Sequence, residues 1–508
     1  MMMTDPKPRK RIKCETEIPE PTCLVIFGAS GDLAMRKLIP SLYRLFHHRR
    51  LPRNFSVCGL GRTPIRPDRF RDLAGRAAKQ AFPEAFDDSS WKEFALKLDY
   101  TGFEYGERES YVNLGEKLVS LEKKHRTRGN RIFYLAIPPS VYETVVRHLG
   151  ALDLSRAERG YARIVIEKPF GRDLASAKAL NATLRESFEE RQIYRIDHYV
   201  AKETVQSLLM FRFANSIFEP LWNNRYVDHV QITSSETLGV EHRAGYYEKA
   251  GVLRDTFQNH MLQLLALTAM EPPDSAEAER VRDERVKVLR SIRSFPLERL
   301  DETLVIGQYG GGQIRGRGVV GYREEKGVSR ESTTATFAAM KVFVDNWRWN
   351  GIPFYLRSGK RMSDRKIEVS IHFKPIPHSM FTSIMEGPID PNVLVFRIQP
   401  DEGISLNFQT KEPGSKICLK PVLMDFSYQK EVLLEAYEWV LLDCMQGDST
   451  LFMRVESVEQ AWSLLTPVIE KVESTAESSD FPNYEAGSSG PREAAHLIER
   501  DGRKWRPL

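Results

Sequence analysis

The chain has 508 residues, enough for about three domains of ordinary size with substantial cores. Its hydrophobic and charged fractions, 41% and 28%, are ordinary for a soluble protein, and its formal net charge is +5. This small positive excess suits an anionic small molecule. Without a stripe of Lys and Arg interleaved with aromatics, it argues against nucleic acid as a partner. No apolar run approaches the roughly 18 residues of a membrane span, so no membrane association is expected.

Cysteine usage and the terminal segments set further bounds. The five cysteines are sparse and odd in number, as is typical of reduced thiols, which predicts a cytoplasmic location. Residues 1–20 are polar and carry a cluster of Lys and Arg among prolines, so they are expected to form a disordered tail and not a targeting segment. A second loose segment, rich in Ser, Glu, Gly and Pro, is expected near Ser474 to Pro491.

The first part of the chain alternates short apolar runs with helical patterns. The runs predicted to be strands are Cys23–Phe27, Phe55–Gly59, Ile132–Ile137 and Arg163–Ile166. A helix is predicted from Val141 to Leu149, after the break made by Pro138 and Pro139. This alternation predicts an α/β fold with a Rossmann-type, doubly wound parallel sheet over residues 21–200.

A glycine-containing turn, Gly28–Ala34, follows the first predicted strand with the spacing G-x-x-G-x-x-A. Small residues let the backbone approach phosphate oxygens, and the start of the next helix supplies donors and a positive field. Glycines that serve only the turn are the alternative, but the place after the first buried strand favours a dinucleotide-binding domain. The residues expected to contact the cofactor here are Gly28, Ser30, Gly31, Asp32, Leu33 and Lys37.

The end of the second strand bears on which nicotinamide is bound. An NAD site usually places an acid there for the ribose 2′-hydroxyl, whereas this chain reads Gly59-Leu-Gly-Arg62-Thr63. Arg62 could bind a 2′-phosphate and stack on adenine, and Lys37 could also reach the phosphates. Both could instead be ordinary surface cations. NADP is therefore favoured, with NAD as a weaker alternative.

Residues Arg195–Glu203 gather an acid, an imidazole, a phenol and an ammonium. If this stretch runs into a helix, His198 and Lys202 lie on one face and make a clamp for a dianionic phosphate. Tyr199 adds a neutral donor, and Asp197 then points elsewhere and can orient another catalytic group. The alternative is a solvated helix start with ordinary polar pairs.

Beyond about residue 200 the apolar runs lengthen and alternate with polar residues. Examples are Asp228–Thr233, Ile367–Phe373 and Asn392–Ile398. Period-two alternation is typical of a sheet with one exposed face, usually antiparallel. With a helical pattern from Gly251 to Met270, it predicts a larger α+β domain with a mostly antiparallel sheet over residues 201–508.

A dehydrogenase acting on an alcohol needs a base for the hydroxyl proton. His260 is a candidate because it precedes the apolar run Met261–Leu267, where a polar residue is placed to face a cleft. A lone histidine at such a place is nevertheless more often structural, and no spacing pairs it with a distant aspartate.

Four motifs occur together in this order: Gly28–Ala34, Glu167–Gly171, Arg195–Glu203 and Arg254–His260. From about residue 21 to beyond Trp462, the chain resembles the glucose-6-phosphate dehydrogenase family. The resemblance implies oxidation of glucose 6-phosphate at C1 to 6-phosphoglucono-lactone with hydride transfer to NADP, the first oxidative step of the pentose phosphate pathway. It also implies a homodimer or homotetramer and no metal.

The resemblance further implies roles for individual residues. His260 corresponds to the base that takes the C1 hydroxyl proton, Asp197 to its orienting partner, and Lys168 to a lysine between substrate and nicotinamide. The residues implied at the substrate are His198, Tyr199, Lys202 and Lys360 for the phosphate, Glu236 and Asp255 for sugar hydroxyls, and Arg365 and Gln399 at further positions.

Two other hypotheses remain. A catalytically silent sugar-phosphate or NADP-binding sensor on the same fold would need a broken His–Asp–Lys set, but this chain keeps His260, Asp197 and Lys168. A related oxidoreductase could act on an unphosphorylated or different hexose. His198 together with Lys202 argues against that hypothesis.

Overall fold

The computed structural model describes residues 18–84, 86–157, 159–381, 389–414, 418–428 and 434–508, so most of the predicted N-terminal tail lies outside the described residues. The chain divides into two compact units. The first comprises Met1–Ile166, Glu186–Ile193 and Val440–Asp448, and the second comprises Glu167–Arg185, Tyr194–Trp439 and Ser449–Leu508. The domain bounds given from the sequence stay a prediction.

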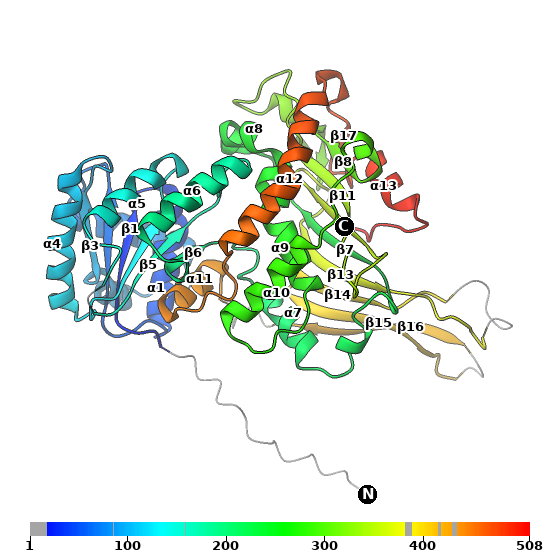
Figure 1. Ribbon diagram of the computed structural model, residues 1–508, viewed down its shortest axis with the longest axis horizontal. Helices are drawn as coiled ribbons and strands as arrows, with labels where there is room; N and C mark the ends of the chain where they lie inside the picture. Colours follow the sequence, from blue (N-terminus) through cyan, green and yellow to red (C-terminus); the bar gives the residue numbers. More distant parts are fainter. Residues whose placement is uncertain (1–17, 85, 158, 382–388, 415–417, 429–433) are drawn as a thin grey trace, which may run out of the picture. The chain divides into compact units, whose positions relative to one another are not determined.

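The first unit is built on a six-stranded sheet with the order β3-β2-β1-β4-β5-β6 (Figure 1). Its strands are β1 Thr22–Phe27, β2 Phe55–Gly61, β3 Leu98–Gly102, β4 Arg131–Leu135, β5 Ala162–Ile166 and β6 Ile193–Arg195. The pairs β1·β2, β1·β4, β2·β3 and β4·β5 are all parallel. This is the strand order of doubly wound dinucleotide-binding folds, and it confirms the predicted fold class.

Helices accompany this sheet, which explains why every residue of β1 is buried. They are η1 Ala34–Leu38 (a π-helical turn), α1 Ile39–His47, α2 Pro67–Ala81, α3 Asp88–Ala95, α4 Arg108–His125 and α5 Tyr142–Ala151. Helix α6 Leu174–Ser187 falls mostly in the second unit. Helix α5 confirms the helix predicted after Pro139. The strands β3 and β6 were not predicted.

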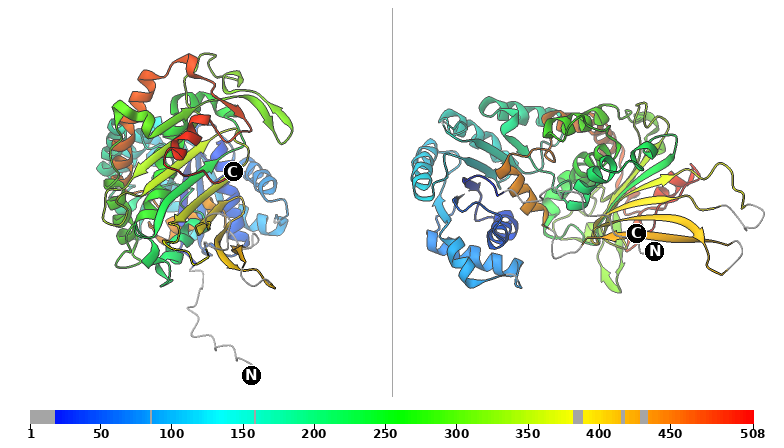
Figure 2. Two further views of the ribbon diagram at one scale, coloured as in Figure 1. Left: turned by 90° about the vertical axis from the view of Figure 1, so that its right-hand side faces the viewer. Right: turned by 90° about the horizontal axis from the view of Figure 1, so that it is seen from below.

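The second unit contains an eight-stranded sheet with the order β16-β15-β14-β13-β7-β12-β11-β8 (Figure 2). The strands are β7 Val227–Ser235, β8 Leu304–Gly307, β11 Phe337–Phe343, β12 Pro353–Gly359, β13 Lys366–Phe373, β14 Val393–Gln399, β15 Gly403–Lys411 and β16 Leu419–Ser427. All pairs are antiparallel except β7·β12. The predicted α+β domain with a mostly antiparallel sheet is confirmed.

A small sheet joins β9 (Tyr309–Ile314), β10 (Arg317–Val319) and β17 (Tyr484–Ala486). The expectation of a loose segment near Ser474 to Pro491 was therefore wrong. Polar composition suggested a loop, but Tyr484 is buried, and its ring packs 5.6 Å from that of Phe337.

Helices lie in front of the large sheet in Figure 1. The long helices of the second unit are α7 Glu203–Phe213, α8 Ala244–Val252, η6 Leu253–Met261, α9 Leu262–Ala269, α10 Ala278–Arg290, α12 Val455–Thr475 and α13 Arg492–Glu499. Helix α11 Ala436–Gln446 lies mostly in the first unit. The short 3-10 helices of the chain are η2 Pro139–Val141, η3 Glu190–Gln192, η4 Glu219–Leu221, η5 Glu241–Arg243, η7 Leu297–Glu302, η8 Tyr322–Glu324 and η10 Ser478–Asp480. Among the described residues, no helix combines the length and apolar character needed to cross a membrane.

The helix predicted from Gly251 to Met270 is present, but its first part is unusual. Residues Leu253–Met261 form a π-helix, η6, which continues directly into α9. A π-helix bonds residue i to residue i+5 and is frequently found at functional sites. It therefore marks where a site should be sought.

Candidate active site

The residues between β6 and α7 form a turn and not the helix start considered above. Helix α7 begins at Glu203, so the shared helical face proposed for His198 and Lys202 was wrong. The cause is local: Asp197 Oδ1 accepts a hydrogen bond of 3.0 Å from the backbone N–H of Tyr199. Such an aspartate bond stabilises a turn at the expense of a helix. In this turn Asp197 is buried, with an exposed fraction of 3%.

Asp197 meets His260 in the interior of the second unit. Its Oδ1 forms a short hydrogen bond with Nδ1 of His260, whose exposed fraction is 2%. The other ring nitrogen, Nε2, lies 2.9 Å from Nζ of Lys168. An Nδ1–H donated to the carboxylate leaves Nε2 as the lone-pair nitrogen, which accepts from the Lys168 ammonium in this state.

Burial and charge set the protonation states of this pair. Burial opposes ionisation of Asp197, but the charge and hydrogen bond of His260, with the charges of His198 and Lys168, lower its pKa to about 2. Burial lowers the pKa of His260, although Asp197 acts in the opposite direction. At neutral pH the carboxylate is therefore ionised and the imidazole neutral, as a proton acceptor requires.

The π-helix η6 explains how two of its residues reach the same lysine. Nζ of Lys168 donates to the backbone oxygen of Asp255 at 2.9 Å and lies 3.4 Å from its Oδ1, as well as 2.9 Å from His260 Nε2. Five residues of an α-helix turn through about 500°, which would place residues 255 and 260 on different faces. The wider π-helical turn brings residues i and i+5 nearly into line.

Asp255 is held by several cations and one hydroxyl. Burial opposes its ionisation, yet the charges of Lys168, Arg243 and Lys360 keep its pKa well below the ordinary range. Arg243 lies 3.5 Å from Oδ1 of Asp255, and the hydroxyl of Tyr246 donates to the same oxygen at 3.3 Å. Sequence reasoning missed Arg243 and Tyr246, because a kink at Gly251 separates them from η6 and leaves no helical spacing to detect.

A second group of residues surrounds Lys202. Its Nζ donates to Oε1 of Gln399 at 2.5 Å and lies 4.8 Å from the ring centroid of Tyr199. The Tyr199 ring stacks on His260, with centroids 3.9 Å apart and planes 10° apart. Burial lowers the pKa of Lys202 to about 8, and the charge of Arg365 acts in the same direction. Tyr199 thus contacts both a cation and the buried histidine.

The remaining predicted substrate residues lie around these two groups. Lys360 and Glu236 follow β12 and β7, whose parallel ends pair Gly359 with Ser235, and the Lys360 Nζ to Glu236 Oε2 distance is 2.9 Å. In this state Lys360 bonds to Glu236. The expectation that Lys360 and Lys202 bind the same substrate phosphate stays a prediction. His198 is partly buried, with its ring centroid 4.9 Å from that of His260.

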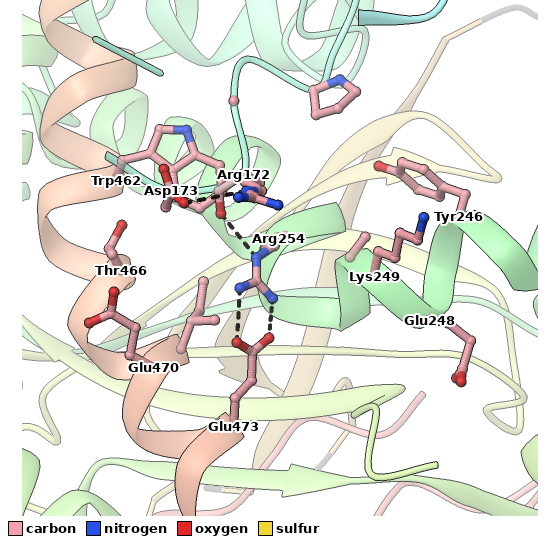
Figure 3. Close-up of a pocket in the computed structure, with 14 residues that line it drawn as sticks. Arg172, Asp173, Tyr246, Glu248, Lys249, Arg254, Trp462, Thr466, Glu470 and Glu473 are labelled. Atoms are coloured by element: carbon pink, nitrogen blue, oxygen red, sulfur yellow. Dashed lines mark hydrogen bonds and ion pairs between the residues drawn. The ribbon is translucent and has the colours of Figure 1, made fainter. Parts of the chain in front are cut away.

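The loop that carries Lys168 is fastened beside a cavity of about 610 Å³ (Figure 3). Arg254 forms a two-pronged ion pair with Glu473 of α12, and its Nε donates to the backbone oxygen of Arg172 at 3.0 Å. The indole N–H of Trp462 donates to the backbone oxygen of Phe170 at 2.9 Å. These contacts hold the loop against η6 and α12 and so position Lys168.

The predicted cofactor turn lies in the first unit, at the carboxyl end of β1. Gly28 has φ +82°, and a Cβ there would stand 2.3 Å from the backbone oxygen of Ala136. Only glycine fits this position. The N–H of Gly31 donates to the Gly28 oxygen at 2.9 Å, and the N–H of Met35 donates to the Gly31 oxygen at 3.0 Å, so a helix begins directly after the turn.

The end of β2 lies against this turn. A Cβ at Gly61 would be 3.0 Å from Oγ of Ser30, which places the following, exposed Arg62 close to the glycine turn. Asp32 is exposed and pairs with Arg36 at 3.3 Å, while Lys37 is partly buried. Glycines packed this closely and a helix start at the carboxyl ends of parallel strands fit the pyrophosphate of a dinucleotide.

Two family models match the chain almost end to end. Residues 25–207 match the model "Glucose-6-phosphate dehydrogenase, NAD binding domain", and residues 209–506 match "Glucose-6-phosphate dehydrogenase, C-terminal domain". Curated relatives named glucose-6-phosphate 1-dehydrogenase include one from Chlamydia pneumoniae, 45% identical over 497 residues, covering 96% of each chain. Another, from Bacillus subtilis, is 43% identical over 485 residues and covers 95% of this chain and 97% of its own.

Solved structures agree with these matches. The chain is similar to a glucose-6-phosphate dehydrogenase solved in complex with its substrate glucose 6-phosphate, with a TM-score of 0.87, 34% identity, and coverage of 97% of this chain and 100% of that one. A glucose-6-phosphate 1-dehydrogenase from Mycobacterium avium gives a TM-score of 0.81 at 34% identity, with coverage of 97% and 99%. The two matched models, the full-length relatives and the shared fold place this chain in the glucose-6-phosphate dehydrogenase family.

Proposed function

We propose that the chain is a glucose-6-phosphate 1-dehydrogenase, which oxidises glucose 6-phosphate at C1 to 6-phosphoglucono-lactone and reduces NADP. Family membership supports the substrate class. The observation that carries the proposal is the buried line from Asp197 through His260 to Lys168. The ionised carboxylate of Asp197 orients the neutral imidazole of His260. Nε2 of that imidazole can then accept a proton from a substrate hydroxyl that displaces Lys168.

In the proposed reaction, Nε2 of His260 takes the proton of the C1 hydroxyl. The electron pair of the O–H bond forms the C1 carbonyl, and the hydrogen on C1 leaves as hydride. A bound nicotinamide supplies the acceptor for that hydride. Asp197 stabilises the imidazolium that forms, and because its pKa is about 2 it does not take the proton itself. Lys168, once displaced from Nε2, still has Asp255 as a partner.

The substrate is proposed to span the two residue groups of the second unit. Its phosphate lies at Lys202, His198 and Tyr199, since a cation and two donors match a dianion. Glu236 and Asp255 accept hydrogen bonds from the sugar hydroxyls. The further substrate residues proposed are Lys360, Arg365 and Gln399.

The cofactor is proposed to bind at the carboxyl ends of β1 and β2, with Arg62 selecting NADP over NAD. Residues Gly28, Ser30, Gly31, Asp32, Leu33 and Lys37 would hold its pyrophosphate side. A homodimer or homotetramer and a cytoplasmic location complete the proposal.

Absorbance at the reduced-nicotinamide band tests the proposed function directly. The purified chain is mixed with glucose 6-phosphate and NADP, then NAD, and the measurement is repeated with plain glucose. Rapid reduction with glucose 6-phosphate alone is expected. Binding of either ligand without reduction would favour the silent sensor, and faster reduction with plain glucose would favour a different hexose.

A bell-shaped pH profile is expected for kcat/KM with glucose 6-phosphate. Burial lowers the pKa of His260, so the base stays neutral, and activity persists, below the ordinary histidine value of about 6.5. The alkaline limb is expected near pH 8, where Lys202 loses its charge and with it the phosphate contact. Plain glucose should lack that alkaline limb. An identical limb with both substrates would separate Lys202 from the phosphate.

Arg62→Ala should weaken NADP use selectively. A charge-assisted bond to the 2′-phosphate contributes about 1.5–3 kcal/mol, which corresponds to a rise in KM for NADP of roughly 10–100-fold. KM for NAD should change little. Arg66→Ala, another exposed cation four residues further on, is the matched control. Equal losses with both cofactors would mean that Arg62 contacts a part they share.

A further inference from the structure

Arg285 of α10 is a buried cation close to the catalytic pair. Its side chain is 1% exposed, and its guanidinium donates to the backbone oxygen of Thr450 at 2.9 Å and to Oε1 of Gln263. Burial lowers its pKa to about 10, so it is charged at neutral pH. Among the described residues its Nε has no hydrogen-bond partner. A buried charge in this state needs compensation from a nearby opposite charge.

Asp197 offers an oxygen in the same condition. Its Oδ1 serves both His260 and the N–H of Tyr199, whereas Oδ2 is buried and has no partner among the described residues. The amide nitrogen of Gln263 is likewise buried and without a described partner. One buried acceptor and two buried donors are thus unmatched, and the acceptor belongs to the carboxylate that bonds to the proposed base.

The fold connects Gln263 and Arg285 to the helix that carries His260. Gln263 follows His260 by three residues on the continuous helix η6–α9, which places it about one turn further along. Gln263 bonds to Arg285, and α9 and α10 pack against each other.

The segment before Asp197 is fixed to the same region. Arg195, two residues earlier, forms an isolated antiparallel bridge with Met453. Thr450, which accepts from Arg285, lies three residues before Met453. The chain segments that carry the carboxylate and the guanidinium are therefore fastened to one another.

The charges of Arg285 and Asp197 interact. Burial and the neighbouring Arg282 lower the pKa of Arg285, and Asp197 is the carboxylate that raises it. Burial raises the pKa of Asp197, and the charges of His260, His198 and Lys168 lower it.

We propose that Arg285, together with Gln263, is a positioning residue that supports the buried side of the Asp197–His260 pair. One buried water would join the unmatched oxygen of Asp197 to Nε of Arg285 and the amide of Gln263. The fixed positive charge favours the carboxylate and disfavours imidazolium, and so keeps His260 neutral at lower pH. The inference rests on the proposed function, because it concerns the same base.

The test compares Arg285→Gln, which removes the charge but keeps amide donors, with Arg285→Lys, which keeps the charge. The readout is the acid limb of kcat/KM against pH. Arg285→Gln should move this limb upward by roughly half a unit to one unit, because loss of a nearby cation raises the pKa of both members of the pair. Arg285→Lys should leave it nearly in place. Ionisation of the substrate phosphate is common to all variants and cancels.

Arg282→Gln is the matched control, because it removes another buried guanidinium of α10 that is bonded to Glu279. The acid limb of kcat/KM should move less in Arg282→Gln than in Arg285→Gln. A loss of rate at every pH with an unmoved limb in Arg285→Gln would show a structural role only and overturn the proposal. An equal shift in Arg285→Lys would also overturn it, since charge would not be the cause.

If Arg285→Gln does not fold, Gln263→Glu gives a second test, because it leaves Arg285 in place. The added carboxylate offsets the guanidinium, so the limb should again move upward, and an unmoved limb would contradict the proposal. The parental chain distinguishes failure of the proposed function from failure of the proposed role of Arg285. If the parental chain does not oxidise glucose 6-phosphate, the proposed function fails. If it is active and the limbs do not move, only the role of Arg285 fails.

Discussion

His260→Asn is expected to lower kcat by about 10²–10⁴ while KM for glucose 6-phosphate changes little. Asparagine keeps the approximate shape and a polar group facing Asp197 but cannot accept a proton at neutral pH. The hydroxyl of C1 would then have to lose its proton to water, whereas the phosphate contacts around Lys202 would remain. Steady-state kinetics with NADP at saturating concentration give both constants.

A second histidine–aspartate pair, in which the histidine is buried and the aspartate partly exposed, supplies the control. Nδ1 of His229 lies 2.7 Å from Oδ2 of Asp228, and His229 is 6% exposed. His229→Asn makes the same substitution in a pair whose described contacts include none of the proposed catalytic residues, so near-parental kcat is expected. A folded His260→Asn variant that turns over at the parental rate would show that His260 is not the base.

Lys202→Ala is expected to depress kcat/KM with glucose 6-phosphate by on the order of 10²-fold. The loss corresponds to one charge-assisted hydrogen bond of about 2–3 kcal/mol. Because Tyr199 stacks on His260 and lies under the Lys202 ammonium, a phosphate held there also sets the position of C1 relative to the base. With plain glucose, which has no phosphate to hold, the same change should matter much less.

Lys341→Ala controls for the loss of a partly buried lysine elsewhere in the second unit. Its side chain is 18% exposed and pairs with Asp501 at 2.6 Å. Its effect should be small and equal for the two sugars. If Lys202→Ala impaired glucose oxidation as badly as glucose 6-phosphate oxidation, the phosphate role of Lys202 would have to be abandoned.

The strand pattern was predictable because it depends on local periodicity. Cys23–Phe27 is apolar without interruption, as a strand covered on both faces must be. Ile367–Phe373 alternates and is an antiparallel strand as predicted, but the exposed face inferred from that alternation was wrong here, because every residue from Ile367 to Ile371 is buried. Both kinds of sheet were therefore foreseen. Edge strands such as β6, with three residues, are too short to leave a periodic pattern.

The site was predictable only as far as its motifs reach. The spacing of Asp197 and His260 could not predict that their side chains form a hydrogen bond, because the two residues are 63 positions apart and only tertiary packing brings them together. Arg243, Tyr246 and Arg285 lie in helical or turn segments of ordinary composition. Their roles arise from burial and from the partners that the fold supplies.

The π-helical turn gives the catalytic helix one more residue per turn than an α-helix needs. Because Asp255 and His260 are aligned by i to i+5 bonding, deletion of one residue between them would leave them four apart in an ordinary α-helix. Four residues of an α-helix turn through about 400°, so both side chains would stay on one face. A substitution that restored α-helical bonding at unchanged length would instead separate them by about 140°, and is therefore the more damaging change to this alignment.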